Sequence, residues 1–218
     1  MDKREFVNHI KDILELDDFK AVGVGAGSVS LVREKEEIII SYNKYLGEFI
    51  LPPAIGCRKC FDEVENILEK YFVKQGLGYG RNTIHHSSRR EEDLDKRTIV
   101  NSEDFNKILP ELHAMIYDDI LPFFEKYQTL ENVHNQLNTF GNDFGLVNKL
   151  LSNPQPIRRI IINKLCGDGD WKEKALAVQA SFDEASKSGQ YKEMYSSYAQ
   201  IVEELIEELE AMPSTHPA

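Results

Sequence analysis

The sequence predicts an α+β protein: an N-terminal helix and a mainly antiparallel β-meander packed by helices, followed by a helical C-terminal half that ends in an αα-hairpin. Two observations predict this class. Residues 21–57 contain short runs in which apolar and polar side chains alternate, the pattern of strands that bury one face. After residue 102, apolar side chains recur every three or four residues, which is the period of an amphipathic helix. Because the apolar face of a sheet needs a covering layer, we expect the helices to pack on the meander.

The length and composition are those of an ordinary soluble globular protein. The chain has 218 residues, of which 41% are hydrophobic and 29% are charged, and it is long enough to bury a sizeable core. We expect an α+β domain over residues 1–138 and a helical extension packed on it over residues 139–218. The two parts could also form one continuous domain.

The charge and the apolar runs restrict the classes of partner. No apolar run approaches the roughly 20 residues of a membrane span, and the first ten residues are too charged for a secretory signal. We therefore expect a cytoplasmic protein whose three cysteines stay reduced. The net charge of −11 opposes binding to nucleic acid and to anionic membranes, and it favours a basic protein as the partner. The sequence does not indicate the oligomeric state.

Three strands of the meander are predicted by alternation, at residues 28–31, 38–42 and 48–51. Polar residues 34–37 form a hairpin tip, and residues 46–48 form a second turn or bulge. The glycine-rich residues 23–27 would suit a phosphate loop only if a helix followed them. Strand-like residues follow instead and the lysine of such a loop is missing, so we expect a flexible turn between strands.

Helical spacing appears on both sides of the meander. We expect helices over residues 2–16 and 58–72, and the glycines of residues 76–80 should end the second helix because their backbone entropy opposes helix formation. Residues 82–87 are a further candidate strand. Residues 89–96 read as a polar loop.

The second half contains several helix-boundary residues. Ser102 is expected to cap a helix in which Pro110 either makes a kink or begins a new helix. Thr129 and Asp143 are expected to cap two further helices. Residues 154–166 suit either a helix or a strand, since prolines at their start favour a helix and a run of isoleucines favours a strand.

The last two helices give the clearest pattern. Apolar stripes run along residues 171–185 and 191–209, and the short segment 188–190 joins them. So short a connection makes neighbouring helices antiparallel, which predicts an αα-hairpin.

The order of these elements, with Leu-Pro-Phe-Phe at residues 121–124 and Gly-Gln-Tyr at residues 189–191, resembles a bacterial family known as domain of unknown function 4304. The resemblance covers roughly residues 1–138 and implies an α+β fold with no catalytic residues to transfer. The chain is also loosely similar to immunity proteins of bacterial toxin systems, which are often small, acidic and α+β. That similarity implies a function in binding another protein.

Cys57 and Cys60 have the spacing of a redox or zinc motif, and they are expected at the start of a helix, where thiol pKa values fall. No strand–helix–strand pattern surrounds them. A zinc site would need two further ligands, for which Cys166 and His85 are the candidates. We therefore expect structural thiols and neither a metal nor a cofactor.

His85, His86, Arg89 and Arg90 form a compact set of side chains suited to acid–base or anion chemistry. Successive side chains of a strand point to opposite faces, so only one of the two histidines can line a given site. No acid is placed by spacing to orient that histidine. A small enzyme that uses a histidine at 85 or 86 and holds an anionic substrate with Arg89 or Arg90 is therefore the alternative function.

The last helix carries an acidic face without interspersed bases, made of Glu203, Glu204, Glu207, Glu208 and Glu210. Like charges at these spacings cost some helix stability, and a basic partner would relieve that cost. The sequence thus predicts a non-catalytic protein-binding module with this face as the contact for a basic partner. A deep pocket that contained one of the histidines would favour the enzyme instead.

Overall fold

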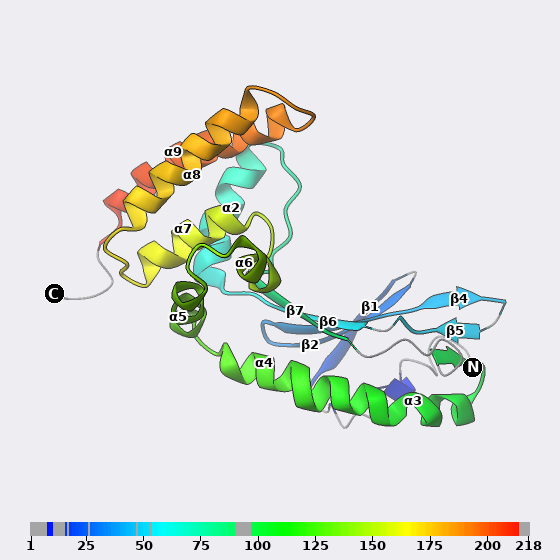
Figure 1. Ribbon diagram of the computed structural model, residues 1–218. Helices are drawn as coiled ribbons and strands as arrows, with labels where there is room; N and C mark the ends of the chain where they lie inside the picture. Colours follow the sequence, from blue (N-terminus) through cyan, green and yellow to red (C-terminus); the bar gives the residue numbers. More distant parts are fainter. Residues whose placement is uncertain are drawn as a thin grey trace. The chain divides into compact units, whose positions relative to one another are not determined.

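The computed structural model describes residues 8–10, 16, 18–25, 27–46, 48–52, 54–89 and 97–213 (Figure 1). Most of the predicted helix over residues 2–16 and the whole of residues 90–96, Arg90 included, lie outside the described residues. The chain forms two compact units, which alternate along the sequence. The sheet unit comprises Met1–Lys59 and His85–Gln128, and the helical unit comprises Cys60–Ile84 and Thr129–Ala218. The division predicted at residue 138 stays a prediction.

The α+β class is confirmed, with antiparallel sheets in one unit and a helix pair at the end of the chain. The main sheet has five strands in the order β1-β2-β3-β6-β7. Its strands are β1 (Lys20–Gly25), β2 (Ser28–Arg33), β3 (Glu36–Ser41), β6 (Ala54–Lys59) and β7 (Ile84–Arg89). A smaller sheet has the order β4-β5-β8, with β4 (Asn43–Tyr45), β5 (Glu48–Ile50) and β8 (Thr98–Ile99).

The β2–β3 hairpin shows why alternation located the strands. Val29 pairs with Ile40 and Leu31 pairs with Ile38, and all four side chains are buried on one face of the sheet. The turn is shorter than the predicted tip, because Glu36 already belongs to β3. The alternation fixes this register, since a shift by one residue would expose all four side chains.

A strand follows the glycine-rich segment, as predicted, since β2 begins at Ser28. The predicted turn over residues 23–27 is too long, because residues 23–25 belong to β1. Gly27 has a φ of 112°, which side chains rarely adopt, and its carbonyl accepts a hydrogen bond from the backbone N–H of Tyr42 at 2.8 Å. A Cβ at this position would lie 3.3 Å from the Tyr42 carbonyl oxygen. Glycine is therefore required here by the close approach of two backbone segments.

The predicted start of the second helix is wrong. Helix α2 spans Asp62–Lys74, whereas residues 58 and 59 belong to β6. Cys57 pairs with Ile38 and Lys59 pairs with Glu36 of β3, and the Lys59 Nζ lies 3.0 Å from the Glu36 Oε1. Pairing with β3 and this ion pair extend the strand through residues that on their own would suit the first turn of a helix.

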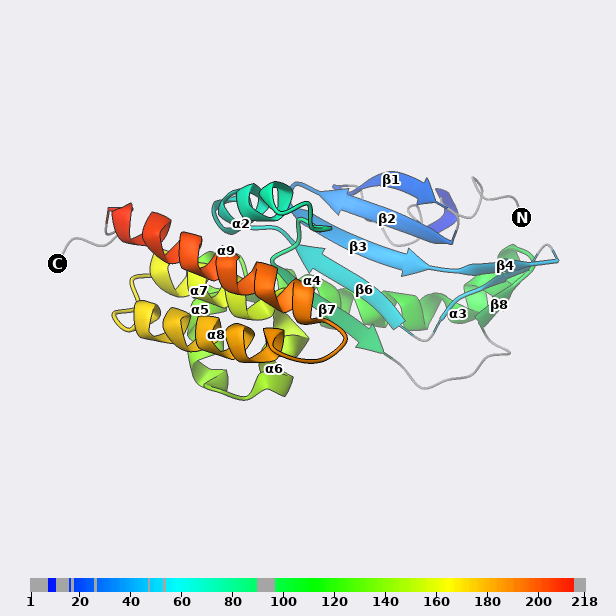
Figure 2. The same ribbon diagram turned by 90° about the horizontal axis from the view of Figure 1, so that it is seen from above.

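A long helix covers one face of the main sheet (Figures 1 and 2). It consists of α3 (Ser102–Ala114), the π-helical turn η2 (Met115–Ile120) and α4 (Leu121–Lys126). Phe105, Ile108, Leu112 and Ile116 lie on the inner stripe and share one buried cluster with the side chains of β2 and β3. Burial of this stripe supplies the hydrophobic stabilisation of the unit.

The structure corrects the predicted cap of this helix and decides between the two alternatives for Pro110. The cap is Asn101 and not Ser102, because the Asn101 Oδ1 accepts hydrogen bonds from the backbone N–H groups of Glu103 and Asp104 at 2.8 and 3.1 Å. Pro110 lies inside α3 and does not begin a new helix. The wider turn η2 follows five residues later, and π-helical turns are one of the ways in which a helix absorbs a local irregularity.

The helical unit is arranged around α7 (Gln155–Leu165), which contacts α2, α5, α8 and α9. The other helices are α5 (Leu130–Phe140), α6 (Phe144–Leu150), α8 (Trp171–Ser186) and α9 (Lys192–Ala211). Thr129 caps α5 and Asp143 caps α6, as predicted. The ambiguous segment 154–166 forms helix α7. Other helices surround α7 and bury its isoleucines, so the apolar run that resembles a strand belongs to a buried helix.

Helices α8 and α9 lie side by side and form the predicted αα-hairpin (Figure 2). Ala175 and Ala199, both buried, provide small side chains on the two helices. The Phe182 ring of α8 packs edge-on against the Tyr198 ring of α9, with centroids 5.4 Å apart. Gly189, in the connection between the helices, has a φ of 95°.

A buried ion pair joins α2 to α7. The Arg158 Nε lies 2.9 Å from the Glu65 Oε1, the Arg158 Nη2 lies 2.9 Å from the Glu65 Oε2, and both side chains are fully buried. The remaining Arg158 donors bond to the carbonyl oxygens of Ser152, Asn153 and Gly80. All five N–H groups of the guanidinium are thus satisfied.

Glu65 has further donors of its own. The hydroxyls of Thr83, at 2.7 Å, and Tyr79 donate to its carboxylate. Thr83 in turn accepts a hydrogen bond from the backbone N–H of Phe61 at 2.9 Å. This network connects α2, the segment that follows it and α7, and it satisfies both charges away from water.

We expect Arg158→Met to lower the free energy of unfolding by about 3–5 kcal/mol, because it leaves the Glu65 carboxylate buried without its counterion. Urea denaturation followed by circular dichroism measures this change. The control is Arg81→Met, since Arg81 pairs with Asp62 at 2.9 Å on the surface of the same unit. Exposed pairs contribute about 0–1 kcal/mol. Equal effects of the two substitutions would contradict the structural role of the buried pair.

Candidate functional site

The acidic face of α9 is divided by the structure into two edges. Glu203 and Glu207 are exposed, one turn apart, and continue a solvent-facing line that begins with Glu193, Ser196 and Gln200. Glu204 and Glu208 lie beside this line and are partly buried. The two edges therefore meet different surroundings.

The partly buried edge contacts α2. The Glu204 carboxylate lies 2.8 Å from the Lys74 Nζ, and the Glu208 carboxylate lies 2.8 Å from the Lys70 Nζ. The Tyr71 hydroxyl also donates to the Glu208 Oε2 at 2.7 Å. These bonds hold α9 against α2, so this edge has partners within the unit.

The pKa values of these two carboxyl groups reflect their partners. The hydrogen bond from Lys74 lowers the pKa of Glu204. Burial alone would raise the pKa of Glu208, but the hydrogen bonds from Lys70 and Tyr71 lower it overall. Both groups are therefore ionised at neutral pH. Sequence patterns could not predict this pairing, because Lys74 and Lys70 precede their glutamate partners by 130 and 138 residues.

The exposed glutamates of α9 differ from the paired ones. Among the described residues, neither Glu203 nor Glu207 forms an ion pair, whereas Glu210 pairs with Lys172 of α8. We call Glu203 and Glu207 the exposed edge of α9. It is the part of the predicted acidic face that remains available to a partner of opposite charge.

The histidines of β7 lie in different surroundings. The His86 ring stacks on Phe123 of α4, with centroids 5.1 Å apart and an angle of 16° between the rings. Ser88, on the same face of the strand, donates a hydrogen bond to the Asp119 Oδ2 at 2.5 Å. The structure thus brings together His86, Ser88, Phe123 and Asp119. It is a group that sequence spacing could not predict, because the contacts come from a distant helix.

The remaining members of the predicted set are placed elsewhere. His85 and Arg89 occupy the alternate positions of β7 and share the opposite face from His86. Arg90 lies outside the described residues. His86 is thus not combined with Arg89 in one site, which agrees with the expectation that only one histidine can face a given side.

Burial lowers the pKa of His86, although the charge of Asp119 opposes that shift. The folded-state pKa therefore lies below the unfolded value of about 6.5, and between the two values the unfolded chain binds more protons. The contribution of this histidine to stability is complete above pH of about 6.5 and is lost as the pH falls toward the folded-state pKa.

We expect His86→Gln to reduce the loss of stability between about pH 7.5 and 5.5, because it removes this proton uptake. The free energy of unfolding in urea is measured at both pH values. His113→Gln, which removes an exposed histidine of α3, is the control for the loss of a histidine side chain. An unchanged pH dependence in His86→Gln would contradict the burial of a neutral imidazole.

The cysteines have no activating surroundings. Cys57 is buried in β6, and Cys60 precedes α2 without belonging to it, so the premise of a motif that opens a helix is wrong. Burial raises the pKa of Cys57 to about 12 and the pKa values of Cys60 and Cys166 to about 11. Across the described ranges, no group of three or more His, Cys, Asp and Glu side chains is placed to hold a metal ion.

We expect iodoacetamide to label Cys57 at pH of about 8 at least ~100-fold more slowly in the native protein than in urea, because only the thiolate reacts and its formation is suppressed. Mass spectrometry of the labelled peptides measures the rates. Elemental analysis of the same sample tests the expected absence of zinc. Fast native labelling of Cys57, or zinc in a stoichiometric amount, would contradict the interpretation.

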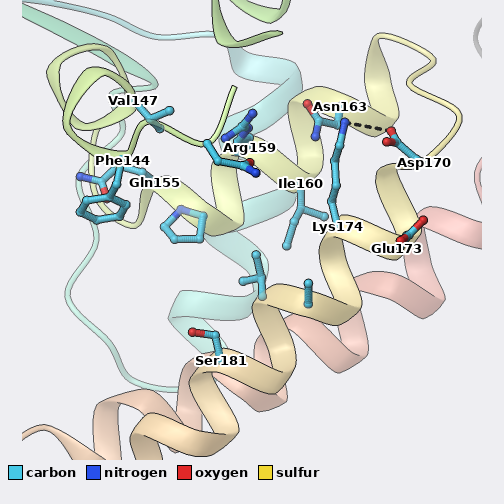
Figure 3. A pocket seen from close by; sticks show the side chains of 14 residues that line it. Phe144, Val147, Gln155, Arg159, Ile160, Asn163, Asp170, Glu173, Lys174 and Ser181 are labelled. Atoms are coloured by element: carbon cyan, nitrogen blue, oxygen red, sulfur yellow. Dashed lines mark ion pairs between the residues drawn. The ribbon is translucent and has the colours of Figure 1, made fainter. Parts of the chain in front are cut away.

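A cavity of about 500 Å³ lies in the helical unit and not beside the histidines (Figure 3). Its lining comes from α6, α7, α8 and the segments next to them, and contains no histidine. A deep pocket around His85 or His86 would have favoured a histidine enzyme. This cavity is not such a pocket, because neither histidine lines it.

Comparison with protein families, with curated proteins and with solved structures finds no match to this chain. Within the part of the chain that the structure describes, every helix is too short or too polar to span a bilayer.

Proposed function

We propose that the protein is a non-catalytic, cytoplasmic protein-binding module, similar in its mode of action to immunity proteins, and that the exposed edge of α9 contacts a basic partner. The observation that carries the proposal is the exposure of Glu203 and Glu207, one turn apart and without an ion pair among the described residues, in a chain with a net charge of −11.

The physical argument concerns compensation of charge. Like charges one helical turn apart repel each other by a few tenths of a kcal/mol, and a cation bound across them removes that repulsion. The neighbouring Glu204 and Glu208 already have lysine partners, so only the exposed edge gains from a basic ligand. Charges at the rim of an interface act mainly on the rate of association.

The alternative, a small enzyme built on His85 or His86 and Arg89 or Arg90, gains no support from the arrangement of β7. His86 packs on Phe123, and Arg89 occupies an alternate position of the strand. The resemblance to domain of unknown function 4304 stays a prediction, and it supplies no catalytic residue.

The test compares two double variants that remove the same charge from the same helix. Glu203→Gln/Glu207→Gln removes the exposed edge, and Glu204→Gln/Glu208→Gln removes the paired edge. A partner is captured by cross-linking from the native host and purified. Its association rate with each protein is then measured by surface plasmon resonance across ionic strength.

We expect the exposed-edge variant to associate about threefold to tenfold more slowly at low salt and to unfold at an unchanged temperature. The paired-edge variant should lose about 1 kcal/mol of stability, because it breaks the bonds to α2. An acidic partner, or equal association rates for the exposed-edge variant and the unmodified protein, would contradict the proposal.

A further inference from the structure

The cavity of the helical unit has the size of a small-molecule site. Its volume of about 500 Å³ falls within the range of roughly 300–1,000 Å³ that is typical of ligand pockets. Much of its wall is apolar and comes from three helices (Figure 3). The apolar lining residues are Phe144, Val147, Pro156, Ile160, Ala177 and Val178. We call this space the α7–α8 cavity.

Arg159 lines the α7–α8 cavity with a guanidinium that is poorly compensated. Its Nη2 makes a long hydrogen bond of 3.4 Å to the carbonyl oxygen of Leu137, and its Nε is buried without a partner. It forms no ion pair with a described residue. Burial lowers the pKa of Arg159, while the more distant charge of Asp168 opposes the shift. A half-buried cation without a counterion is costly, so this site favours an anion.

Asn163 lies one turn further along α7 and also lines the cavity. Only 1% of its surface is exposed, and neither its Nδ2 nor its Oδ1 has a hydrogen-bond partner in the described structure. Each buried, unsatisfied polar atom costs about 1–3 kcal/mol. Both atoms are covered in the free protein, so the amide must turn about its side-chain bonds to reach a ligand.

The other charged side chains around the cavity form no ion pair with Arg159 among the described residues. Asp168 and Asp170 lie 2.7 and 2.8 Å from the Lys174 Nζ, and Figure 3 shows Lys174 extending toward Asp170. Lys174 is shared by the two acids, so these three groups carry one negative charge in excess, and the charge of Asp168 acts on Arg159 from beyond ion-pair distance. Glu173 is exposed and needs no partner. Among the charged side chains that line the cavity, Arg159 is the one that is half-buried and forms no ion pair with a described residue.

We propose that the α7–α8 cavity binds a small organic carboxylate with an apolar body. The carboxylate is held by the Arg159 guanidinium, the apolar body packs on Ile160 and Val178, and the Asn163 amide turns to complete the polar contacts. This site is independent of the exposed edge of α9. It adds a small-molecule ligand to the proposed protein partner.

The net negative charge of the protein makes a comparison of charged and neutral ligands informative. A net charge of −11 repels anions at a distance, so preference for a carboxylate over a neutral analogue has to come from the local guanidinium. The probes are hexanoate, phenylacetate and indole-3-acetate, each paired with its primary amide, which has the same shape and no charge. Binding to the ¹⁵N-labelled full chain is followed by two-dimensional NMR.

We expect at least one carboxylate to bind about tenfold or more tightly than its amide and to shift the backbone resonances of α7 and α8. Arg159→Gln should abolish this preference. Arg81→Gln, which removes an arginine of the same unit outside the cavity lining, should retain it. Ala177→Leu, which narrows the cavity from the exposed side of α8, should weaken binding of acid and amide alike.

The comparison of acid with amide uses the unmodified protein, so it remains decisive even if Arg159→Gln fails to fold. Equal affinity for acid and amide would overturn the proposal. So would the absence of saturable binding for all three carboxylates up to ~10 mM, or resonance shifts confined to residues outside the cavity.

Discussion

The helical unit depends on the buried ion pair between Arg158 and Glu65. Two charges without water are tolerable only when every donor and acceptor is satisfied, and here the guanidinium bonds to a carboxylate and three carbonyl oxygens. These acceptors come from α2, from the segment after α2 and from the turn before α7. A geometry with five simultaneous bonds admits little variation, so the pair fixes how these segments meet.

Arg159, the next residue on α7, has few hydrogen-bond partners where Arg158 has many. Consecutive residues of a helix point about 100° apart, so Arg158 faces α2 while Arg159 faces the α7–α8 cavity. The first arginine has a full set of acceptors, and the second has one long hydrogen bond. Two identical side chains thus differ in their surroundings, and the proposed ligand site uses the one that lines the cavity.

The acidic face of α9 also combines side chains that have partners with side chains that face solvent. Glu204 and Glu208 bond to lysines of α2 and so stabilise the packing of the unit, whereas Glu203 and Glu207 face solvent. The repulsion between carboxylates on one helix is thereby relieved on one edge and retained on the other. In the two proposals, a basic partner and a small carboxylate bind different parts of one helical unit. The basic partner contacts two glutamates, and the carboxylate contacts an arginine, that form no ion pair with a described residue.

The sequence by itself determined the β2–β3 hairpin, the caps at Thr129 and Asp143 and the final helix pair, because periodicity and capping act between residues close along the chain. It did not determine that residues 58 and 59 extend β6, since pairing with β3 decides that, nor that the isoleucines of α7 form a helix, since their burial among other helices does. The partners of Glu65, Glu204 and Glu208 were decided only by the tertiary structure. So was the lack, among the described residues, of an ion pair at Arg159 and of a hydrogen bond at the Asn163 side chain. Such contacts join residues up to 138 positions apart, and no local pattern records which distant side chain a charge will meet.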